Sequence, residues 1–186
     1  MVDLTGTDAL WVVDKVKEQT TLVIPIHITG AGATSALISA IIQRDNTLDI
    51  GGSSVKINVV QTDKPMNGVL NEMDFSPGYN KQMCGDPGEC VNTMGGNKAH
   101  INSDNENSIG AAAHDILHFA GIDDQYKELP RDDKGSRTSE PKPGYDKSNI
   151  MTDRSGTKLK PEQIQEAQKN WSTKQCTVED GVTKCK

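Results

Sequence analysis

The chain has few aromatic residues. Phenylalanine, tryptophan and tyrosine together make up 4% of its 186 residues, and hydrophobic residues make up 34%. The mean hydropathy is also negative, so we expect a polar chain with long loops rather than a densely packed fold. The length nevertheless suits one domain with a real core.

Three further absences exclude classes of protein. The sequence has no run of about 18 apolar residues, so we expect no membrane span. Its first ten residues lack the basic and apolar regions of a signal peptide, so export would depend on something outside this chain. A basic excess is missing too: the formal net charge of −6 argues against a nucleic-acid partner, because such proteins carry a basic stripe. We expect a monomer.

The most informative segment runs from residue 114 to 124 and reads HDILHFAGIDD. His114 and His118 are four residues apart, so on a helix both imidazoles lie on one face and can bind one ion. Gly121 is placed to end that helix with a positive φ and to turn the chain back. Asp124 then completes a three-ligand site, which leaves a fourth position for water, as in catalytic zinc sites.

The alternative is that the two histidines are simply packed or solvated. The surrounding apolar residues argue against it, because they form a helix that would bury both histidines beside Asp115. Buried imidazoles and carboxylates need partners, and a shared metal supplies them. The apolar residues are Ala111, Ala112, Ala113, Ile116, Leu117, Phe119 and Ala120.

Asp115 stands where the H-E-x-x-H motif has the glutamate that acts as general base. Its stem is one methylene shorter, which sets the carboxylate back by roughly 1.5 Å, and a misplacement of about 1 Å can cost about a hundredfold in rate. Metal binding should survive this change, but turnover is at risk. Two origins stay open: a natural aspartate, or a deliberate Glu→Asp change that tames a harmful enzyme.

The stretch from Ala113 to Tyr126, AHDILHFAGIDDQY, resembles the active-site helix of metzincin-type zinc metallopeptidases, especially the snapalysin-like ones with Asp as third ligand. SNIMTDRSG (148–156) resembles their Met-turn, and LKPEQIQEAQKNW (159–171) their C-terminal helix. The resemblance covers residues 98 to 171. It implies an α+β fold with a small mixed twisted sheet, Met151 as an apolar floor beneath the metal, and Tyr126 as a group that stabilises the oxyanion.

The N-terminal stretch VDLTGTDAL, Val2 to Leu10, resembles the D-P-x-G-x-D motif that precedes the toxin domains of rearrangement-hotspot (Rhs) proteins, with Leu4 in place of proline. The resemblance implies that residues 1–10 end an Rhs-type shell. Residues 11–186 would then form a metallopeptidase-like toxin domain, delivered into a target cell and opposed by an immunity protein. An ordinary N-terminal turn is the alternative.

Three functions therefore remain in view. The first is a zinc-dependent endopeptidase that cleaves target-cell proteins, and the second is a metal-binding but weakened or inactive variant that acts by binding a partner. The third is a toxin that acts on nucleic acid or lipid through the same metal; we disfavour it because such sites rarely combine H-x-x-x-H-x-x-G with a Met-turn.

Upstream, the hydrophobic pattern predicts a mixed sheet onto which the active-site helix packs. A strand, a helix and a second strand in succession imply a right-handed crossover. Pro25 suggests that the first strand is an edge or is irregular. The expected elements are a short helix-like segment at Ala9–Lys17, a strand at Thr21–Thr29, a helix at Ser35–Gln43 capped near Thr34, and a strand at Val55–Thr62.

The two remaining histidines lack metal-ligand spacing to the pair. We expect His27 to be packed or capped on its strand, and His100 either packed or on an edge strand that borders the cleft and pairs with substrate. From Lys127 to Lys147 the chain is rich in Asp, Lys, Pro, Gly and Ser. This loop of about twenty residues either borders the cleft or is a solvated excursion.

The four cysteines form two local pairs. In CTVEDGVTKC, Asp180-Gly181 predicts a type I′ hairpin, and counting outward places Cys176 opposite Cys185 at a position suited to a disulfide. Cys84 and Cys90 bracket a turn-rich loop. Zinc binding by all four is the alternative, but no C-x-x-C spacing occurs. Two disulfides imply an oxidising compartment.

Overall fold

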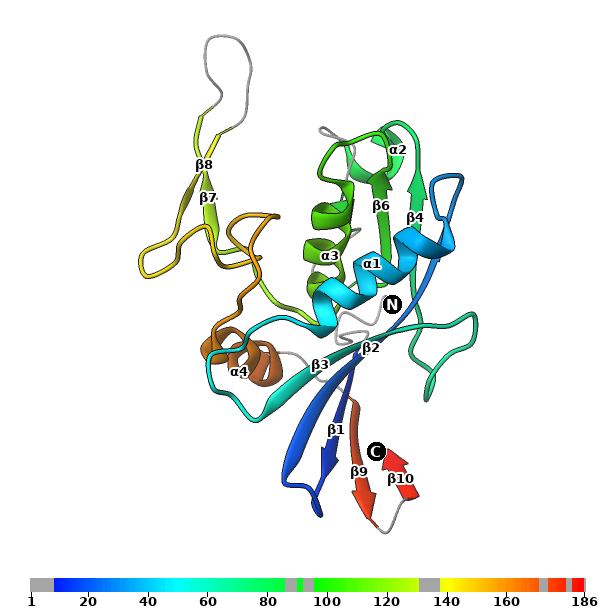
Figure 1. The fold of residues 1–186 in the computed structure, drawn as a ribbon, viewed down its shortest axis with the longest axis vertical. Coiled ribbons are helices and arrows are strands. Elements are labelled where there is room, and N and C mark those ends of the chain that lie inside the picture. Colours follow the sequence, from blue (N-terminus) through cyan, green and yellow to red (C-terminus); the bar gives the residue numbers. More distant parts are fainter. Residues whose placement is uncertain are drawn as a thin grey trace, which may run out of the picture.

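The computed structural model describes residues 9–85, 90–91, 96–130, 138–170, 174–179 and 182–185 (Figure 1). Helices and strands alternate along this part of the chain, and the α+β class predicted from the sequence is confirmed. In chain order the elements are β1 (Leu10–Asp14), β2 (Gln19–Thr29), α1 (Ser35–Asn46), β3 (Val55–Gln61), β4 (Asn71–Ser76), α2 (Lys81–Cys84), β5 (Cys90–Val91), β6 (Lys98–Asn102), α3 (Ser108–Phe119), β7 (Tyr126–Glu128), β8 (Ser139–Pro141), α4 (Pro161–Asn170), β9 (Lys174–Glu179) and β10 (Val182–Cys185).

The main sheet is mixed, as the sequence predicts. Its strand order is β10-β9-β1-β2-β4-β6-β5, and β3 also pairs with β2. The pairs β2–β3, β2–β4, β4–β6 and β1–β9 are parallel, whereas β1–β2, β5–β6 and β9–β10 are antiparallel. β7 and β8 form a separate antiparallel hairpin that projects from the body of the molecule (Figure 1).

The unit β2–α1–β3 agrees with the strand–helix–strand prediction. α1 begins after Thr34, whose side chain accepts a hydrogen bond from the Leu37 backbone, as expected of an N-cap. β2 is an interior strand, so Pro25 marks the irregular position rather than an edge. It falls between the register with β1, which ends at Val23, and the register with β4, which begins at Ile26. The Pro25 carbonyl accepts a hydrogen bond of 2.7 Å from the Asn71 side chain.

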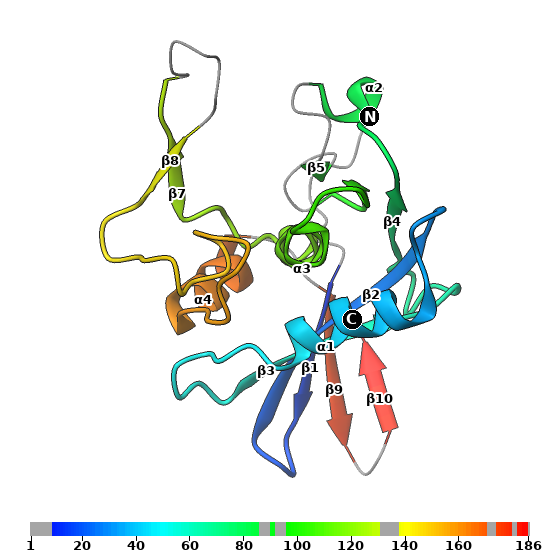
Figure 2. The same ribbon diagram turned by 45° about the horizontal axis from the view of Figure 1, so that its top comes forward.

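The main core lies between one face of the sheet and the helices α1 and α3 (Figure 2). Alternate residues of the central strands point into it because successive side chains of a strand face opposite sides. The strand residues in this core include Ile24, Ile26, Ile28, Ile57, Val59, Met73, Phe75, Ala99 and Ile101. α3 is buried along almost its whole length, which places its two histidines inside the domain.

Three expectations are corrected. Ala9–Lys17 is not helical, because its Leu10–Asp14 part forms β1 and pairs with both β2 and β9, and these partners outweigh the helix-like spacing. His100 does not lie on an edge, since β6 is paired with β4 on one side and with β5 on the other. The segment from Lys127 to Lys147 is not one irregular loop, because it contributes to β7 and supplies β8; residues 131–137 lie outside the described residues.

Both predicted disulfides are present, so no cysteine of the chain remains for zinc. Cys176 and Cys185 are directly opposite in the β9–β10 hairpin, in the predicted register, with Cα atoms 3.9 Å apart. Cys176 is buried in a second, smaller cluster with Leu10, Val23 and Val69. Cys84 at the end of α2 is bonded to Cys90 in β5. The predicted Asp180-Gly181 turn lies outside the described residues.

The segment that resembles an Rhs motif lies outside the described residues up to residue 8, and Leu10 is the first residue of β1. Among the described helices, none has the length and apolar character needed to cross a bilayer.

Candidate metal centre

The end of α3 is shaped by Gly121. Its φ is +76°, in the region that glycine adopts without steric cost. The Gly121 amide donates to the His118 carbonyl at 2.9 Å, and the Ile122 amide donates to the Leu117 carbonyl at 3.2 Å. These two bonds form a Schellman motif, which stops the helix and reverses the chain. The turn predicted from the sequence is therefore the device that brings the next residues back over the histidines.

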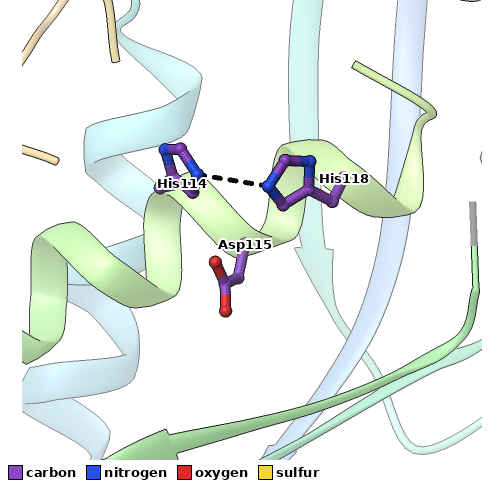
Figure 3. A group of neighbouring side chains, drawn as sticks. All are labelled: His114, Asp115 and His118. Carbon is purple, nitrogen blue, oxygen red and sulfur yellow. Dashed lines mark hydrogen bonds between the residues drawn. The ribbon is translucent and has the colours of Figure 1, made fainter. Parts of the chain in front are cut away.

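The two imidazoles face each other across one helical turn. Nε2 of His114 lies 3.1 Å from Nε2 of His118, and the two rings sit on the same side of α3 (Figure 3). Nδ1 of His114 lies 2.7 Å from the Ile150 carbonyl oxygen, and Nδ1 of His118 lies 2.8 Å from the Ile122 carbonyl oxygen. A carbonyl can only accept, so each Nδ1 carries a proton, and in a neutral ring the Nε2 lone pair then points at the other ring.

Asp124 completes the convergence. Its Oδ1 lies 2.9 Å from Nε2 of His114 and 3.4 Å from Nε2 of His118. This oxygen is buried and has no hydrogen-bond donor when both rings are neutral. With both rings neutral, three electron-pair donors therefore meet, and either a further proton or a metal ion satisfies them. The fold therefore brings together His114, His118 and Asp124, the three residues predicted from the spacing. The buried group of His114, Asp115 and His118 could hold a metal ion.

Protons compete for the same atoms. Burial alone would raise the pKa of Asp124, but hydrogen bonds and charge from His114 and His118 outweigh burial and hold that pKa well below its usual range. Burial likewise acts to lower the pKa of His118, yet the Asp124 and Asp115 carboxylates and the Ile122 carbonyl together raise it. Without an ion, a second proton on an imidazole supplies the positive charge that this cluster of acceptors requires.

Asp115 lies beside the histidines but projects from another side of α3 than the two facing rings (Figure 3). One ligand atom of each of His114, Asp115 and His118 lies within 4.8 Å of the others. The Asp124 Oδ1 lies 2.9 and 3.4 Å from the two Nε2 atoms, so Asp124 and Asp115 are both candidates for a third ligand. Burial raises the pKa of Asp115, and the charges of His114, His118 and Arg154 offset this only in part; its Oδ2 is buried without a hydrogen-bond partner.

The segment predicted to be a Met-turn packs directly against the histidines. Met151 is fully buried in the main core. Its amide is held by Asn149 Oδ1 at 3.0 Å, and its carbonyl accepts a hydrogen bond of 2.7 Å from the Gln125 amide, next to Asp124. Sequence reasoning placed this turn near the metal but missed the role of Ile150, whose carbonyl orients the His114 ring. A backbone acceptor leaves no trace in the residue type.

Tyr126 reaches the site through β7. Its ring centroid lies 6.4 Å from that of His114. Burial, and then the nearby Asp124 carboxylate, raise the pKa of Tyr126 well above its usual range. The structure therefore places Tyr126 beside the predicted ligands.

A cleft of about 430 Å³ opens at His114 between α3, the β7–β8 hairpin and the segment predicted to be a Met-turn. The segment from Lys127 to Lys147 therefore does border the cleft, one of the two alternatives that the sequence left open. The cleft is lined by polar and charged residues, namely Asn107, His114, Tyr126, Glu128, Thr138, Ser139, Thr152, Asp153 and Arg154. Apart from its place in the predicted Met-turn, nothing in the sequence indicated Arg154.

The other two histidines lie elsewhere. His27 on β2 is outside the cleft. His100 is packed, with Nδ1 2.9 Å from Asp74 Oδ2 and Nε2 3.0 Å from the Gly78 carbonyl oxygen. Neither His27 nor His100 belongs to the group of His114, Asp115 and His118, whose ligand atoms are close enough to share an ion.

No protein-family model, curated protein or solved structure matches this chain.

Proposed function

We propose that this protein is a zinc-dependent endopeptidase whose metal is held by His114, His118 and Asp124. The observation that carries the proposal is the convergence of the two Nε2 atoms and one buried carboxylate oxygen, separated by 2.9, 3.1 and 3.4 Å. Tetrahedral zinc with bonds of about 2.0–2.1 Å separates its ligand atoms by about 3.3 Å. Two imidazoles and one carboxylate also match the ligand types of catalytic zinc, which keeps an open fourth position.

When bound, zinc supplies a Lewis acid and lowers the pKa of water toward neutrality. Around it, Ile150 and Ile122 hold the two rings in the tautomer that presents Nε2. In this mechanism Asp115 would accept a proton and pass it to the leaving amine. Tyr126, at the wall of the cleft beside His114, is the group that would stabilise the developing oxyanion.

A second candidate is a metal-binding protein with weakened or absent catalysis that acts by binding a partner. The observation that favours it is the placement of Asp115, whose short side chain is buried and projects away from the facing imidazoles. A general base must come within hydrogen-bond reach of the proton that it abstracts. The two candidates therefore differ in whether the carboxylate of Asp115, one methylene shorter than glutamate, can reach the proton that it must abstract.

We further propose that the domain is part of a larger secreted toxin of the Rhs type, cleaves proteins of a target cell and is neutralised by an immunity protein. The sequence stretch from Val2 to Leu10 supports this origin. The two disulfides support passage through an oxidising compartment, because reducing compartments rarely retain them.

The test compares zinc content and peptide cleavage for this chain, His118→Ala, Asp115→Glu and His27→Ala. We expect about one zinc per chain in all but the His118→Ala variant, with His27→Ala as the control for loss of a histidine outside the site. Cleavage should rise about a hundredfold in Asp115→Glu. Activity confined to the Asp115→Glu form would sink the first candidate for this chain and leave the second. Absence of zinc from the unchanged chain would contradict both.

A readout in cells separates peptidase activity from a toxin that acts on nucleic acid or lipid. We expect mass spectrometry of cells that express Asp115→Glu to find newly cut proteins that are absent with His118→Ala. Toxicity that depends on His118 but leaves every protein intact would instead favour the nucleic-acid or lipid target.

A further inference from the structure

We propose that Arg44, on α1, is a positioning residue for the metal centre: its guanidinium holds the segment 149–156, and this segment orients the His114 ring. This inference rests on the proposed metal site. Arg44 is 70 residues away from His114 in sequence and does not line the cleft.

The contacts of Arg44 with this segment are direct. Its Nη2 donates to the Arg154 carbonyl at 2.6 Å and to the Gly156 carbonyl at 3.2 Å. Both bonds join residues more than a hundred positions apart and lie in a partly buried environment. Hydrogen bonds from a charged donor are the stronger kind, particularly where water is partly excluded.

Arg44 can affect His114 through the segment 149–156 because the backbone of this segment is tightly packed. A Cβ built on Gly156 would lie 2.6 Å from the Ile150 nitrogen and 2.5 Å from the Asn149 carbonyl carbon. The backbone that Arg44 binds is therefore in close contact with the backbone of residues 149 and 150. The Ile150 carbonyl in turn accepts a hydrogen bond of 2.7 Å from Nδ1 of His114.

The same arginine also holds the segment against α3. The Arg154 carbonyl, which Arg44 binds, would lie 2.4 Å from a Cβ built on Gly110 in the first turns of that helix. Since α1 also packs on α3, the Arg44 guanidinium connects α1, α3 and the segment 149–156. Groups that orient a metal-binding imidazole change metal affinity by about 10–100-fold when they are removed.

The side chain that this role requires is specific. One planar guanidinium reaches two carbonyls, whereas the ammonium of lysine is a compact point charge on a different stem. Arg44→Lys should therefore retain the charge but only part of the positioning, and Arg44→Met should lose both while keeping an unbranched apolar stem. Gln43→Met, on the exposed side of the same helical turn, is the matched control.

The first measurement is the affinity for Zn²⁺ by chelator competition, together with the visible absorption spectrum of the Co²⁺-substituted protein. We expect Arg44→Met to bind Zn²⁺ about tenfold more weakly and to alter the Co²⁺ spectrum, Arg44→Lys to be intermediate, and Gln43→Met to match the unchanged chain. Thermal unfolding without metal records the purely structural cost. Unchanged Zn²⁺ affinity and an unchanged Co²⁺ spectrum in Arg44→Met would overturn the proposal, even if its melting temperature falls.

A metal-independent readout separates this inference from the proposed function. The proton on Nδ1 of His114, hydrogen-bonded to Ile150, should give a slowly exchanging signal in ¹⁵N-edited NMR of the metal-free protein. We expect its exchange to accelerate in Arg44→Met and to stay slow in Gln43→Met. If the unchanged chain binds no zinc, the proposed function fails, and this signal alone decides the role of Arg44. Equal exchange in both variants would count against it.

Discussion

The carbonyl oxygen of Ile150 lies 2.7 Å from Nδ1 of His114, across 36 residues of sequence. This contact fixes the tautomer of the imidazole and aims Nε2 at His118 and Asp124. The segment 149–156 therefore does more than contribute Met151 to the core. It sets the direction of one proposed ligand through a backbone group.

The close packing behind Ile150 predicts the effect of Gly156→Ala. The added methyl group would meet only backbone atoms, at 2.5 to 2.7 Å, so the segment must move. We expect a loss of about 1–3 kcal/mol in the free energy of unfolding, as for other overpacked sites, and weaker Zn²⁺ binding. Urea unfolding and chelator competition measure the two effects.

Gly52→Ala is the control for Gly156→Ala, because a Cβ there meets nothing within 4 Å although φ is +78°. It should cost only the backbone strain of about 1–2 kcal/mol and leave Zn²⁺ affinity unchanged. Equal Zn²⁺ affinity in both variants would refute the link from Gly156 to the metal centre.

Gly121 predicts a graded series. With φ at +76°, alanine at this position should cost about 1–2 kcal/mol, and asparagine, which tolerates the left-handed region better, should cost less. Because this turn returns Asp124 to the histidines, Zn²⁺ affinity should fall in the order Gly, Asn, Ala. Unfolding curves and zinc titrations of the three proteins test this order. Equal Zn²⁺ affinities in all three proteins would contradict it.

Asp45 predicts a pH dependence of stability. Its carboxyl group is fully buried on α1 with neither oxygen hydrogen-bonded, and burial raises its pKa well above the usual value of 3.8, with Arg44 offsetting this in part. Between the unfolded and folded pKa the folded state binds more protons, so this group lowers the stability as the pH rises above about 4. Asp45→Asn, which is neutral at every pH, removes that slope.

We therefore expect the melting temperature of Asp45→Asn, relative to the unchanged chain, to increase steadily from pH 4 to pH 7. The melting temperatures are measured on metal-free protein by differential scanning calorimetry, so that metal binding does not contribute to them. A difference that is constant over this pH range would show that Asp45 has no raised pKa.

The disulfides should differ in what their removal costs. In the chain-entropy account, loops of this size each contribute about 2–3 kcal/mol. Cys176 is also buried in the smaller core cluster, so serine there adds the cost of a buried hydroxyl. We expect Cys176→Ser/Cys185→Ser to lower the melting temperature more than Cys84→Ser/Cys90→Ser, with Zn²⁺ affinity kept in the former. A larger loss from the Cys84–Cys90 pair would contradict this ranking.

Local patterns predicted much of what the fold shows. The cap at Thr34, the turn at Gly121 and the register that opposes Cys176 to Cys185 each depend on a few neighbouring residues, and each is present. Ala9–Lys17 was predicted wrongly, because pairing with β2 and β9 outweighed a weak local spacing. The same limit applies to His100, whose neighbours on both sides were invisible in the sequence.

By itself, the sequence determined the donor set: two histidines one helical turn apart, a glycine that reverses the chain, and Asp124 within reach of both. These depend on helix geometry and turn chemistry over eleven residues, which local interactions decide. Only the tertiary structure decided how the set is aimed. The Ile150 carbonyl, the Arg44 guanidinium and the fit of Gly156 come from distant segments, and their contacts exist only once the sheet, α1 and α3 have packed together.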